Sequence, residues 1–255
     1  MESEDYSPAF TEIAPYYDKL MSFINYQGWV AYIEKINALN NIREKKILDL
    51  ACGTGVCLEL WLQRQYQVIG LDKSFAMLQV CKDKLSKFFL ADDYNWFLIN
   101  GDICNFSLAH KVPIITCLYD SLNYLMREAG LVRCFEKVYE ALWSGGIFIF
   151  DMNTVHSLRD EWGNQTYYRQ DSNIHSTWTN TFNSEKNISS LKLTLTIQRD
   201  GSTVTHREFH QERAYPLSTI KNLLSEVGFS ASLYRHLTFQ PAEESDLRVM
   251  GVARK

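Results

Sequence analysis

Several features that would place a protein in a common class are missing from this chain of 255 residues. No apolar run approaches the roughly 18 residues that a membrane-spanning helix requires. The first five residues are acidic and polar, unlike the start of a signal peptide. We therefore expect no membrane partner, no export and a cytoplasmic location.

Basic charge is also not in excess. The chain has 26 Lys and Arg against 30 Asp and Glu, a net charge of -4, and no strong basic run. Proteins that bind nucleic acids usually present clustered Lys and Arg to the phosphates. This balance argues against a nucleic-acid partner.

The six cysteines form no CxxC pair and lie singly in apolar segments, at Cys52, Cys57, Cys81, Cys104, Cys117 and Cys134. Such a distribution is typical of reduced, buried thiols rather than disulfides, a metal site or a nucleophile. We expect free thiols and no bound metal. Hydrophobic residues make up 46% of the chain and charged residues 22%, so a single sizeable core is expected.

The most informative stretch that is present covers residues 47–55, Ile-Leu-Asp-Leu-Ala-Cys-Gly-Thr-Gly. A short apolar run enters a glycine-containing turn, and residues 56–65 then have helical character. Glycines let the backbone approach a ligand, and the free N–H groups at a helix start favour an anionic or polar group. The pattern predicts a strand, a tight loop and a helix around a nucleotide-like cofactor.

Strand and helix patterns alternate from here on, which indicates parallel strands joined by right-handed helical crossovers. A helix over residues 26–40 precedes them. We expect strands at 46–51, 67–72, 96–100, 112–119, 147–151, 229–234 and 247–253, and helices at 56–65, 74–87, 127–143 and 218–227. The helix 127–143 is expected to stop at Ser144-Gly145-Gly146 through a left-handed cap. The result is a doubly wound, mostly parallel sheet of seven strands.

Residues 164–211 interrupt this alternation with a period of two. Leu191, Leu193, Leu195 and Ile197 share one face, and turn signals occur at 183–187 and 200–201. We expect an antiparallel meander inserted into the α/β frame, acting as a lid or substrate platform.

Two acids accompany the glycine loop. Asp72 ends the second strand, where a carboxylate can accept both hydrogen bonds of a ribose diol; a helix N-cap or a solvated turn residue is the alternative. Asp49 lies inside the first strand and can orient the loop amides and face a cationic methionyl group, or bond only to nearby backbone. The loop lacks the full GxGxxG spacing of a dinucleotide site.

At this point the residues resemble the class I S-adenosyl-L-methionine-dependent methyltransferases, from about Ala14 to the C-terminus. The resemblance is carried by residues 49–55, by Asp72 and by Gly101-Asp102-Ile103, with Ala51 at the family's first loop glycine. It implies a Rossmann-like fold and the product S-adenosyl-L-homocysteine. It also implies that Gly53 and Gly55 contact the methionyl and ribose part of the cofactor and that Asp72 binds the ribose. Asp102 with Ile103 would contact the adenine, and the alternative for Asp102 is a turn residue without a ligand. Asp49, Ala51, Lys73 and Met77 complete this expected set.

Residues 13–18, 26–29 and 119–125 resemble a subgroup that modifies small molecules, including aminosugar N-methyltransferases. In that subgroup an N-terminal tyrosine reaches over the cofactor, which makes Tyr17 the best match and Tyr26 the next; either could instead be a helix-packing aromatic. Tyr119 and Asp120 would line the methionyl group and the acceptor pocket. We expect a helical cap (1–45), a cofactor-binding core (46–153 and 214–255) and an inserted substrate or lid subdomain (154–213).

The predicted reaction is direct in-line transfer of a methyl group to nitrogen or oxygen of a small molecule. Amine acceptors need mainly alignment, whereas a hydroxyl or carbon acceptor also needs a positioned base. Candidates for a catalytic role are Tyr119, His156 and His210. Asp120, Asn153, His206, Glu208, Glu212 and Arg213 are further polar residues expected at this edge of the sheet.

Four of these residues alternate along one predicted strand, at positions 206, 208, 210 and 212. The favoured interpretation is a solvated strand face, with a polar wall of the acceptor pocket and a metal site as alternatives.

Three other functions compete with a small-molecule methyltransferase: a non-catalytic module that binds the cofactor, a nicotinamide-dependent oxidoreductase and an adenine methyltransferase of DNA. The incomplete GxGxxG argues against the second. The third would carry an Asn or Asp, Pro, Pro, aromatic motif where this chain has Tyr119-Asp120-Ser121-Leu122. The acceptor and the choice between monomer and homodimer stay open.

Overall fold

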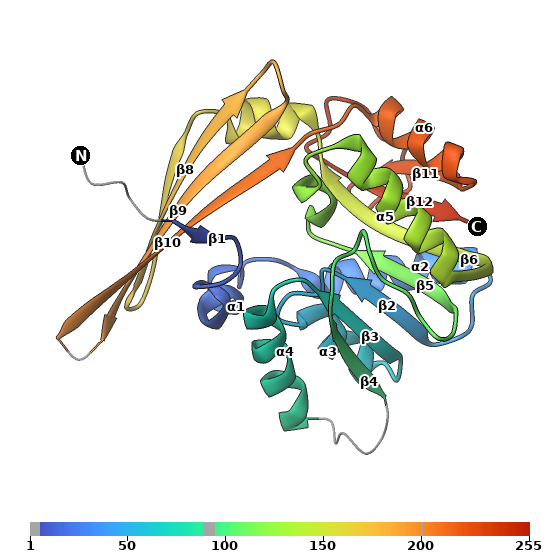
Figure 1. The fold of residues 1–255 in the computed structure, drawn as a ribbon, viewed down its shortest axis with the longest axis horizontal. Helices are drawn as coiled ribbons and strands as arrows, with labels where there is room; N and C mark the ends of the chain where they lie inside the picture. The colour runs from blue at the N-terminus through green and yellow to red at the C-terminus, as the bar shows by residue number, and fades with distance from the viewer. Residues whose placement is uncertain (1–5, 89–94, 200) are drawn as a thin grey trace.

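The computed structural model describes residues 6–88, 95–199 and 201–255. Its centre is a seven-stranded sheet in the order β11-β12-β6-β5-β2-β3-β4, in which only β12 runs antiparallel to its neighbours (Figure 1). The chain order reverses between β2 and β5, and the crevice outside the strand ends at such a point is where ligands bind in open α/β sheets. The predicted doubly wound sheet is confirmed. The strands are β2 (Lys46–Leu50), β3 (Gln67–Asp72), β4 (Trp96–Asn100), β5 (Val112–Cys117), β6 (Leu142–Asn153), β11 (Ser230–Arg235) and β12 (Arg248–Arg254).

Helices cover both faces of this sheet, because its strands are apolar on both sides. Ile47 packs in one cluster with helices α2, α3 and α4, whereas the next residue, Leu48, packs in another with α5 and α6. This alternation makes a doubly covered strand continuously hydrophobic. The helices are α2 (Tyr26–Leu39), α3 (Val56–Gln63), α4 (Phe75–Phe88), α5 (Glu128–Ala141) and α6 (Leu217–Val227).

The end of α5 differs from the prediction. The helix stops at Ala141, and Leu142 already has extended backbone (φ -77°, ψ 141°) as the first residue of β6. Leu142 pairs with Val112, and the register then shifts so that Ile147 lies opposite Ile114. The two glycines therefore lie in an irregular part of the strand. A Cβ on Gly146 would come within 2.9 Å of the Pro113 carbonyl oxygen.

The period-two segment forms an antiparallel sheet beside the core, as predicted, in the order β1-β10-β9-β8-β7 (Figure 1). Leu191, Leu193, Leu195 and Ile197 are buried on one face, together with Ile13, Leu20 and Met21 of the N-terminal segment. The first turn lies at 184–187; of the second, Asp200 is outside the described residues. The strands are β1 (Ser7–Pro8), β7 (Thr166–Asp171), β8 (Ile174–Asn183), β9 (Ile188–Arg199) and β10 (Ser202–Arg213).

In the part of the chain that the structure describes, four short helical segments connect these layers. The N-terminal residues add β1 as a parallel strand to β10, a pairing that the sequence pattern did not predict. Residues 1–5 of the expected N-terminal cap are outside the described residues. The segments are η1 (Ala14–Tyr16), α1 (Tyr17–Leu20), η3 (Ser121–Tyr124) and η4 (Ser157–Trp162), the last with π-helical hydrogen bonding.

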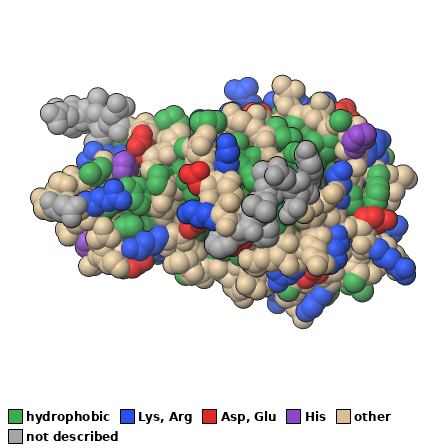
Figure 2. Space-filling view, turned by 90° about the horizontal axis from the view of Figure 1, so that it is seen from below, with side chains coloured by type: hydrophobic (Ala, Val, Ile, Leu, Met, Phe, Trp, Pro, Cys, Tyr) green, Lys and Arg blue, Asp and Glu red, His purple; other side chains and the backbone are tan. Residues whose placement is uncertain are grey.

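On the face in Figure 2, Lys and Arg side chains are scattered among polar, apolar and acidic ones. Of the helices in the described part of the chain, none has the length and hydropathy needed to cross a bilayer.

Candidate active site

The glycine loop lies between the end of β2 and the start of α3. Its backbone enters the left-handed region three times, at Ala51 (φ 54°), Gly53 (φ 56°) and Gly55 (φ 76°). A Cβ on Gly55 would lie 2.3 Å from the sulfur of Cys81, whereas one on Gly53 would meet open space. Gly55 is thus required by packing, and Gly53 keeps the loop open toward a cavity.

Asp72 ties this loop to the next one. Its carboxylate accepts hydrogen bonds from the backbone N–H groups of Gly53 and Ser74, both at 2.7 Å. Burial raises the pKa of Asp72 although both bonds lower it. The N-cap of α4 is supplied by Ser74, whose hydroxyl accepts from the amide of Met77 at 3.1 Å. Asp72 is therefore not simply a helix cap.

Asp49 lies inside β2 and is only 3% exposed. The hydroxyl of Thr116, on neighbouring strand β5, donates to Asp49 Oδ1 at 2.6 Å. The alternative that Asp49 bonds only to backbone is therefore wrong. Burial raises the pKa of Asp49 to about 7, so a cation placed beside it would favour the ionised form.

Asp102 follows the end of β4. It accepts from the backbone N–H of Cys104 at 2.8 Å and from Lys73 Nζ at 3.2 Å. The hydrogen bond from Cys104 is the main reason that the pKa of Asp102 is lowered. Asp102 is an ionised acceptor at neutral pH.

These residues surround a space of about 470 Å³, which we call the loop cavity. Residues 8–11 of the N-terminal segment cover it. Of the thirteen residues predicted to bind a cofactor, Gly55 and Asp120 do not line it. Those that do are Tyr17, Tyr26, Asp49, Ala51, Gly53, Asp72, Lys73, Met77, Asp102, Ile103 and Tyr119.

Three of these are tyrosines that stay neutral. Burial raises the pKa of Tyr17, Tyr26 and Tyr119. The rings of Tyr26 and Tyr119 lie 6.2 Å apart, and the Tyr119 hydroxyl donates to the Met21 sulfur at 3.4 Å. They form an aromatic cover, with hydroxyls that act as hydrogen-bonding groups rather than phenolates.

A strained turn follows β5. Tyr119 (φ 60°) and Asp120 (φ 52°) are both left-handed, a conformation costly for residues other than glycine. Asp151 of β6 holds the turn by accepting both of their backbone N–H groups. Arg248 of β12 then binds the side chains of Asp120 and Asp151. Backbone strain held in this way is concentrated at functional sites.

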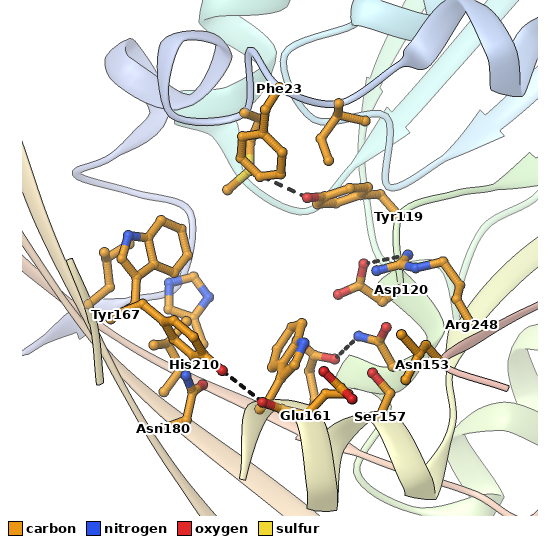
Figure 3. A pocket seen from close by; sticks show the side chains of 18 of the residues that line it. Phe23, Tyr119, Asp120, Asn153, Ser157, Glu161, Tyr167, Asn180, His210 and Arg248 are labelled. Carbon is orange, nitrogen blue, oxygen red and sulfur yellow. Dashed lines mark hydrogen bonds and ion pairs between the residues drawn. The ribbon is translucent and has the colours of Figure 1, made fainter. Parts of the chain in front are cut away.

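Asp120 points into a second space, of about 600 Å³, between the antiparallel sheet and the ends of β5 and β6 (Figure 3). We call it the sheet cavity. Its polar groups include Asp120, Asn153, His210, Glu212 and Arg248. Its aromatic lining consists of Phe10, Tyr17, Phe23, Trp29, Tyr119, Tyr124, Trp162, Tyr167 and Trp178.

The two cavities share one wall. Phe10, Tyr17, Tyr119 and Tyr124 line both of them. A molecule in the loop cavity and one in the sheet cavity would therefore both contact these four side chains.

The alternating residues of β10 are not a solvated face, so that prediction is wrong. Glu208, His210 and Glu212 are 0%, 4% and 4% exposed. The cause is the N-terminal segment, which packs over this part of β10 and donates the amides of Phe10, Thr11 and Ile13 to the Glu208 carboxylate. Within the described residues, no group of three or more His, Cys, Asp or Glu could hold a metal ion.

The candidate catalytic residues separate into two groups. Tyr119 and His210 line the sheet cavity, and His210 faces it from the wall opposite Arg248 (Figure 3). His156 lines neither cavity and pairs with Asp160 at 2.7 Å. His206 pairs with Glu12 at 3.0 Å, also outside both cavities. Sequence reasoning did not single out Phe10, Tyr124 or Arg248.

Comparison with known proteins gives a consistent result. Residues 47–146 match the model of the methyltransferase domain family. A demethylmenaquinone methyltransferase of Bacteroides fragilis is 27% identical, over 93% of this chain and 89% of that protein. An S-adenosylmethionine-dependent methyltransferase from Clostridium acetobutylicum is 27% identical, with a TM-score of 0.84 over 95% of this chain and 97% of the other.

A more distant structure shares the fold. The sugar N-methyltransferase KedS8 from Streptoalloteichus is 16% identical, with a TM-score of 0.79, and the similarity covers 100% of this chain and 98% of that chain. All of these proteins are methyltransferases. The names of the Bacteroides and Streptoalloteichus proteins give different acceptors, so the acceptor has to be argued from the cavities.

Proposed function

Because this chain is a class I S-adenosyl-L-methionine-dependent methyltransferase, we propose that it methylates nitrogen or oxygen of a small molecule bound in the sheet cavity. The observation that carries the proposal is the wall of Phe10, Tyr17, Tyr119 and Tyr124 between two cavities. The methyl donor occupies the loop cavity, the acceptor occupies the sheet cavity, and the methyl group crosses the shared wall.

The donor is held by acids around the glycine loop. A carboxylate offers about four lone-pair sites, so Asp72 can bind a ribose diol while keeping its bonds to Gly53 and Ser74. Asp102 and Ile103 receive the adenine, and Asp49 faces the cationic methionyl part. Tyr17 and Tyr26 close the cavity from the N-terminal side.

The charges around the sheet cavity favour an amine as the acceptor. Asp120, Asp151 and Glu212 are all buried, and Arg248 is paired with the first two. Burial, with Asp120 nearby, raises the pKa of Glu212 well above its usual value. A buried excess of carboxylate is costly unless a cation compensates it. An ammonium group of the acceptor would supply that cation.

The chain's own contribution to catalysis is alignment and exclusion of water. The bound sulfonium supplies an already activated methyl group. Holding the acceptor atom in line with it contributes up to about 7 to 11 kcal/mol in favourable systems. The aromatic side chains of the shared wall provide a dry passage of fixed shape.

A turnover screen tests this proposal. The purified protein with S-adenosylmethionine is offered small amines, aminosugars, alcohols and a reduced naphthoquinone, and S-adenosylhomocysteine formation is measured. We expect turnover with a small amine, or with an alcohol. Turnover with the quinol alone, a carbon acceptor related to the Bacteroides similarity, would show that the assignment to nitrogen or oxygen is wrong.

A further inference from the structure

A chain of three polar side chains, the half-buried Tyr124 and the buried His210 and Glu208, reaches the wall between the cavities. The Tyr124 hydroxyl lies 3.0 Å from His210 Nδ1, and His210 Nε2 lies 3.1 Å from Glu208 Oε2. Glu208 and His210 are 0% and 4% exposed. Such an arrangement joins a hydroxyl, an imidazole and an orienting carboxylate, the combination that activates hydroxyl groups in unrelated enzymes.

Glu208 is held as a carboxylate. Its Oε1 accepts from the amides of Thr11 and Ile13, both at 2.9 Å, and its Oε2 accepts from the amide of Phe10 at 2.7 Å. Burial alone would raise the pKa of Glu208, but the hydrogen bonds from His210, Ile13 and Phe10 together lower it. Because both Glu208 oxygens act as acceptors, the donor in the hydrogen bond between Glu208 and His210 is the imidazole N–H.

The direction of each hydrogen bond follows from this. His210 Nε2 carries the proton and donates to Glu208, so in neutral His210 the Nδ1 atom has a free lone pair. The Tyr124 hydroxyl must then donate to Nδ1. This leaves the oxygen lone pairs of Tyr124 to accept a proton from a molecule in the cavity.

Tyr124 is placed where such a proton would be released. It lines both cavities, and His210 lines the sheet cavity behind it. The Phe10 ring packs against both side chains, with ring centroids 5.2 Å from that of Tyr124 and 5.0 Å from that of His210. Burial raises the pKa of Tyr124 well above its usual value, so the phenol passes a proton on rather than holding a negative charge.

We propose that Tyr124, His210 and Glu208 form a proton relay that deprotonates the acceptor during methyl transfer. The proposal rests on the proposed function. The acceptor gives its N–H or O–H proton to the Tyr124 oxygen while the Tyr124 proton moves to His210 Nδ1. The nitrogen or oxygen forms its bond to the methyl carbon, the carbon–sulfur bond breaks, and its electron pair stays on sulfur as the thioether. Glu208 stabilises the His210 imidazolium until the proton that His210 gained passes to water.

Tyr124 touches the acceptor and is the catalytic residue, whereas His210 and Glu208 are positioning residues that act through it. A proton relay suits an amine that binds as ammonium, because the ammonium must lose a proton before the nitrogen lone pair can attack the methyl group. A hydroxyl acceptor would need the relay for the same reason.

The tautomer of His210 tests the relay without any acceptor. In ¹⁵N-labelled wild-type protein at pH 8, we expect the His210 side chain to show a protonated Nε2 and an unprotonated Nδ1. Resonances are assigned from the His210→Gln variant. A protonated Nδ1 would mean that His210 donates to Tyr124, and the relay would be overturned.

Enzyme kinetics provide the second test of the relay, with the acceptor found in the screen. Tyr124→Phe keeps the ring and removes the hydroxyl, so we expect kcat to fall about a hundredfold or more while KM for the acceptor changes less than about threefold. His210→Ala should lose activity comparably and recover part of it with added imidazole. The control Tyr16→Phe alters a tyrosine that packs on His206 outside both cavities, and kcat should not change.

The two proposals fail in different ways. If no amine or alcohol is methylated by the wild type, the proposed function fails, and the His210 tautomer still decides whether the relay exists. If the wild type is active and Tyr124→Phe retains its kcat, the relay is wrong and the methyltransferase assignment is unaffected.

Discussion

Asp151 accepts the backbone N–H of Asp120 at 3.0 Å and thereby holds a left-handed turn at the end of β5. Asp151 is completely buried, and burial raises its pKa to about 6. It also binds Arg248, which links the last strand to the same turn. The position of Asp120 in the sheet cavity therefore depends on a residue that lines neither cavity.

Asp151→Ala should destabilise the protein, because it leaves the two backbone amides and Arg248 without the acceptor that they share. Hydrogen bonds to charged groups contribute about 1.5 to 3 kcal/mol each, so we expect a loss of about 3 kcal/mol in the free energy of unfolding, measured with urea. Asp160→Ala, which removes a carboxylate from an exposed pair with Arg159, is the control, and its urea midpoint should stay close to that of the wild type. Equal effects would contradict this role of Asp151.

Gly55→Ala and Gly53→Ala separate packing from backbone strain. Both place a side chain at positive φ, which costs about 1 to 2 kcal/mol. Only the first also brings a Cβ to 2.3 Å from the Cys81 sulfur, and overpacking adds about 1 to 3 kcal/mol. Thermal unfolding should show Gly55→Ala as the less stable variant, and Cys81→Ala should restore part of the difference. If Gly53→Ala is equally destabilised, the clash is not the cause.

Asp72→Ala should weaken S-adenosylhomocysteine binding, because the ribose loses a charged acceptor and the amides of Gly53 and Ser74 lose their partner. Two hydrogen bonds to a charged group correspond to at least about a hundredfold in Kd. Calorimetry measures this directly. The control is Asp160→Asn, far from the loop, for which Kd should equal that of the wild type. Unchanged binding after Asp72→Ala would contradict the proposed position of the ribose beside Asp72.

Asp49 predicts a pH dependence for donor binding. Its folded pKa of about 7 lies above the ordinary 3.8, so below pH 7 the ligand-free protein holds a proton there. A cationic donor requires the ionised form, and the affinity for S-adenosylmethionine should fall about tenfold between pH 8 and pH 6. Asp49→Asn should bind weakly at both values. A wild-type affinity that is constant over this range would contradict the role of Asp49.

The same raised pKa has a consequence for stability. The folded protein binds the Asp49 proton more tightly than the unfolded chain, so this group opposes folding increasingly as pH rises from about 4 to about 7. Asp49→Asn should therefore raise the Tm of the ligand-free protein at pH 8 and change it little at pH 4. A lower Tm of the variant at pH 8 would show that the buried carboxylate stabilises the fold.

The structure brings most of the residues expected around the glycine loop together at the loop cavity, because the determinants of this cavity are local. A strand, a glycine turn and an acid at the end of the next strand occupy 26 residues of chain, from 47 to 72, and the loop Gly53 and Asp72 meet through one hydrogen bond. The mostly parallel sheet of seven strands followed from the alternation of strand and helix patterns, whereas the order of the strands came only from the structure. The end of α5 was missed because the glycines at 145 and 146 resemble a helix cap, although they serve an irregular strand.

The sheet cavity could not be read in the same way. Glu208 looked like part of a solvated face because its partners, Phe10 to Ile13, lie up to 198 residues away in the sequence. Arg248 is a single basic residue at the start of a strand, with no local pattern that points to Asp120. Tyr124 lay within a segment expected at the acceptor pocket, but only the fold places it beside His210.

The central claim is that methyl transfer crosses the wall that Phe10, Tyr17, Tyr119 and Tyr124 share. The most direct measurement is a crystal structure of the protein with sinefungin, whose amine replaces the transferable methyl group, together with the acceptor found in the screen. We predict the nucleoside against Asp72 in the loop cavity and the acceptor in the sheet cavity, with its reacting atom beside Tyr124 and the sinefungin amine. An acceptor bound outside the sheet cavity, or a sinefungin amine that points away from the shared wall, would contradict the account.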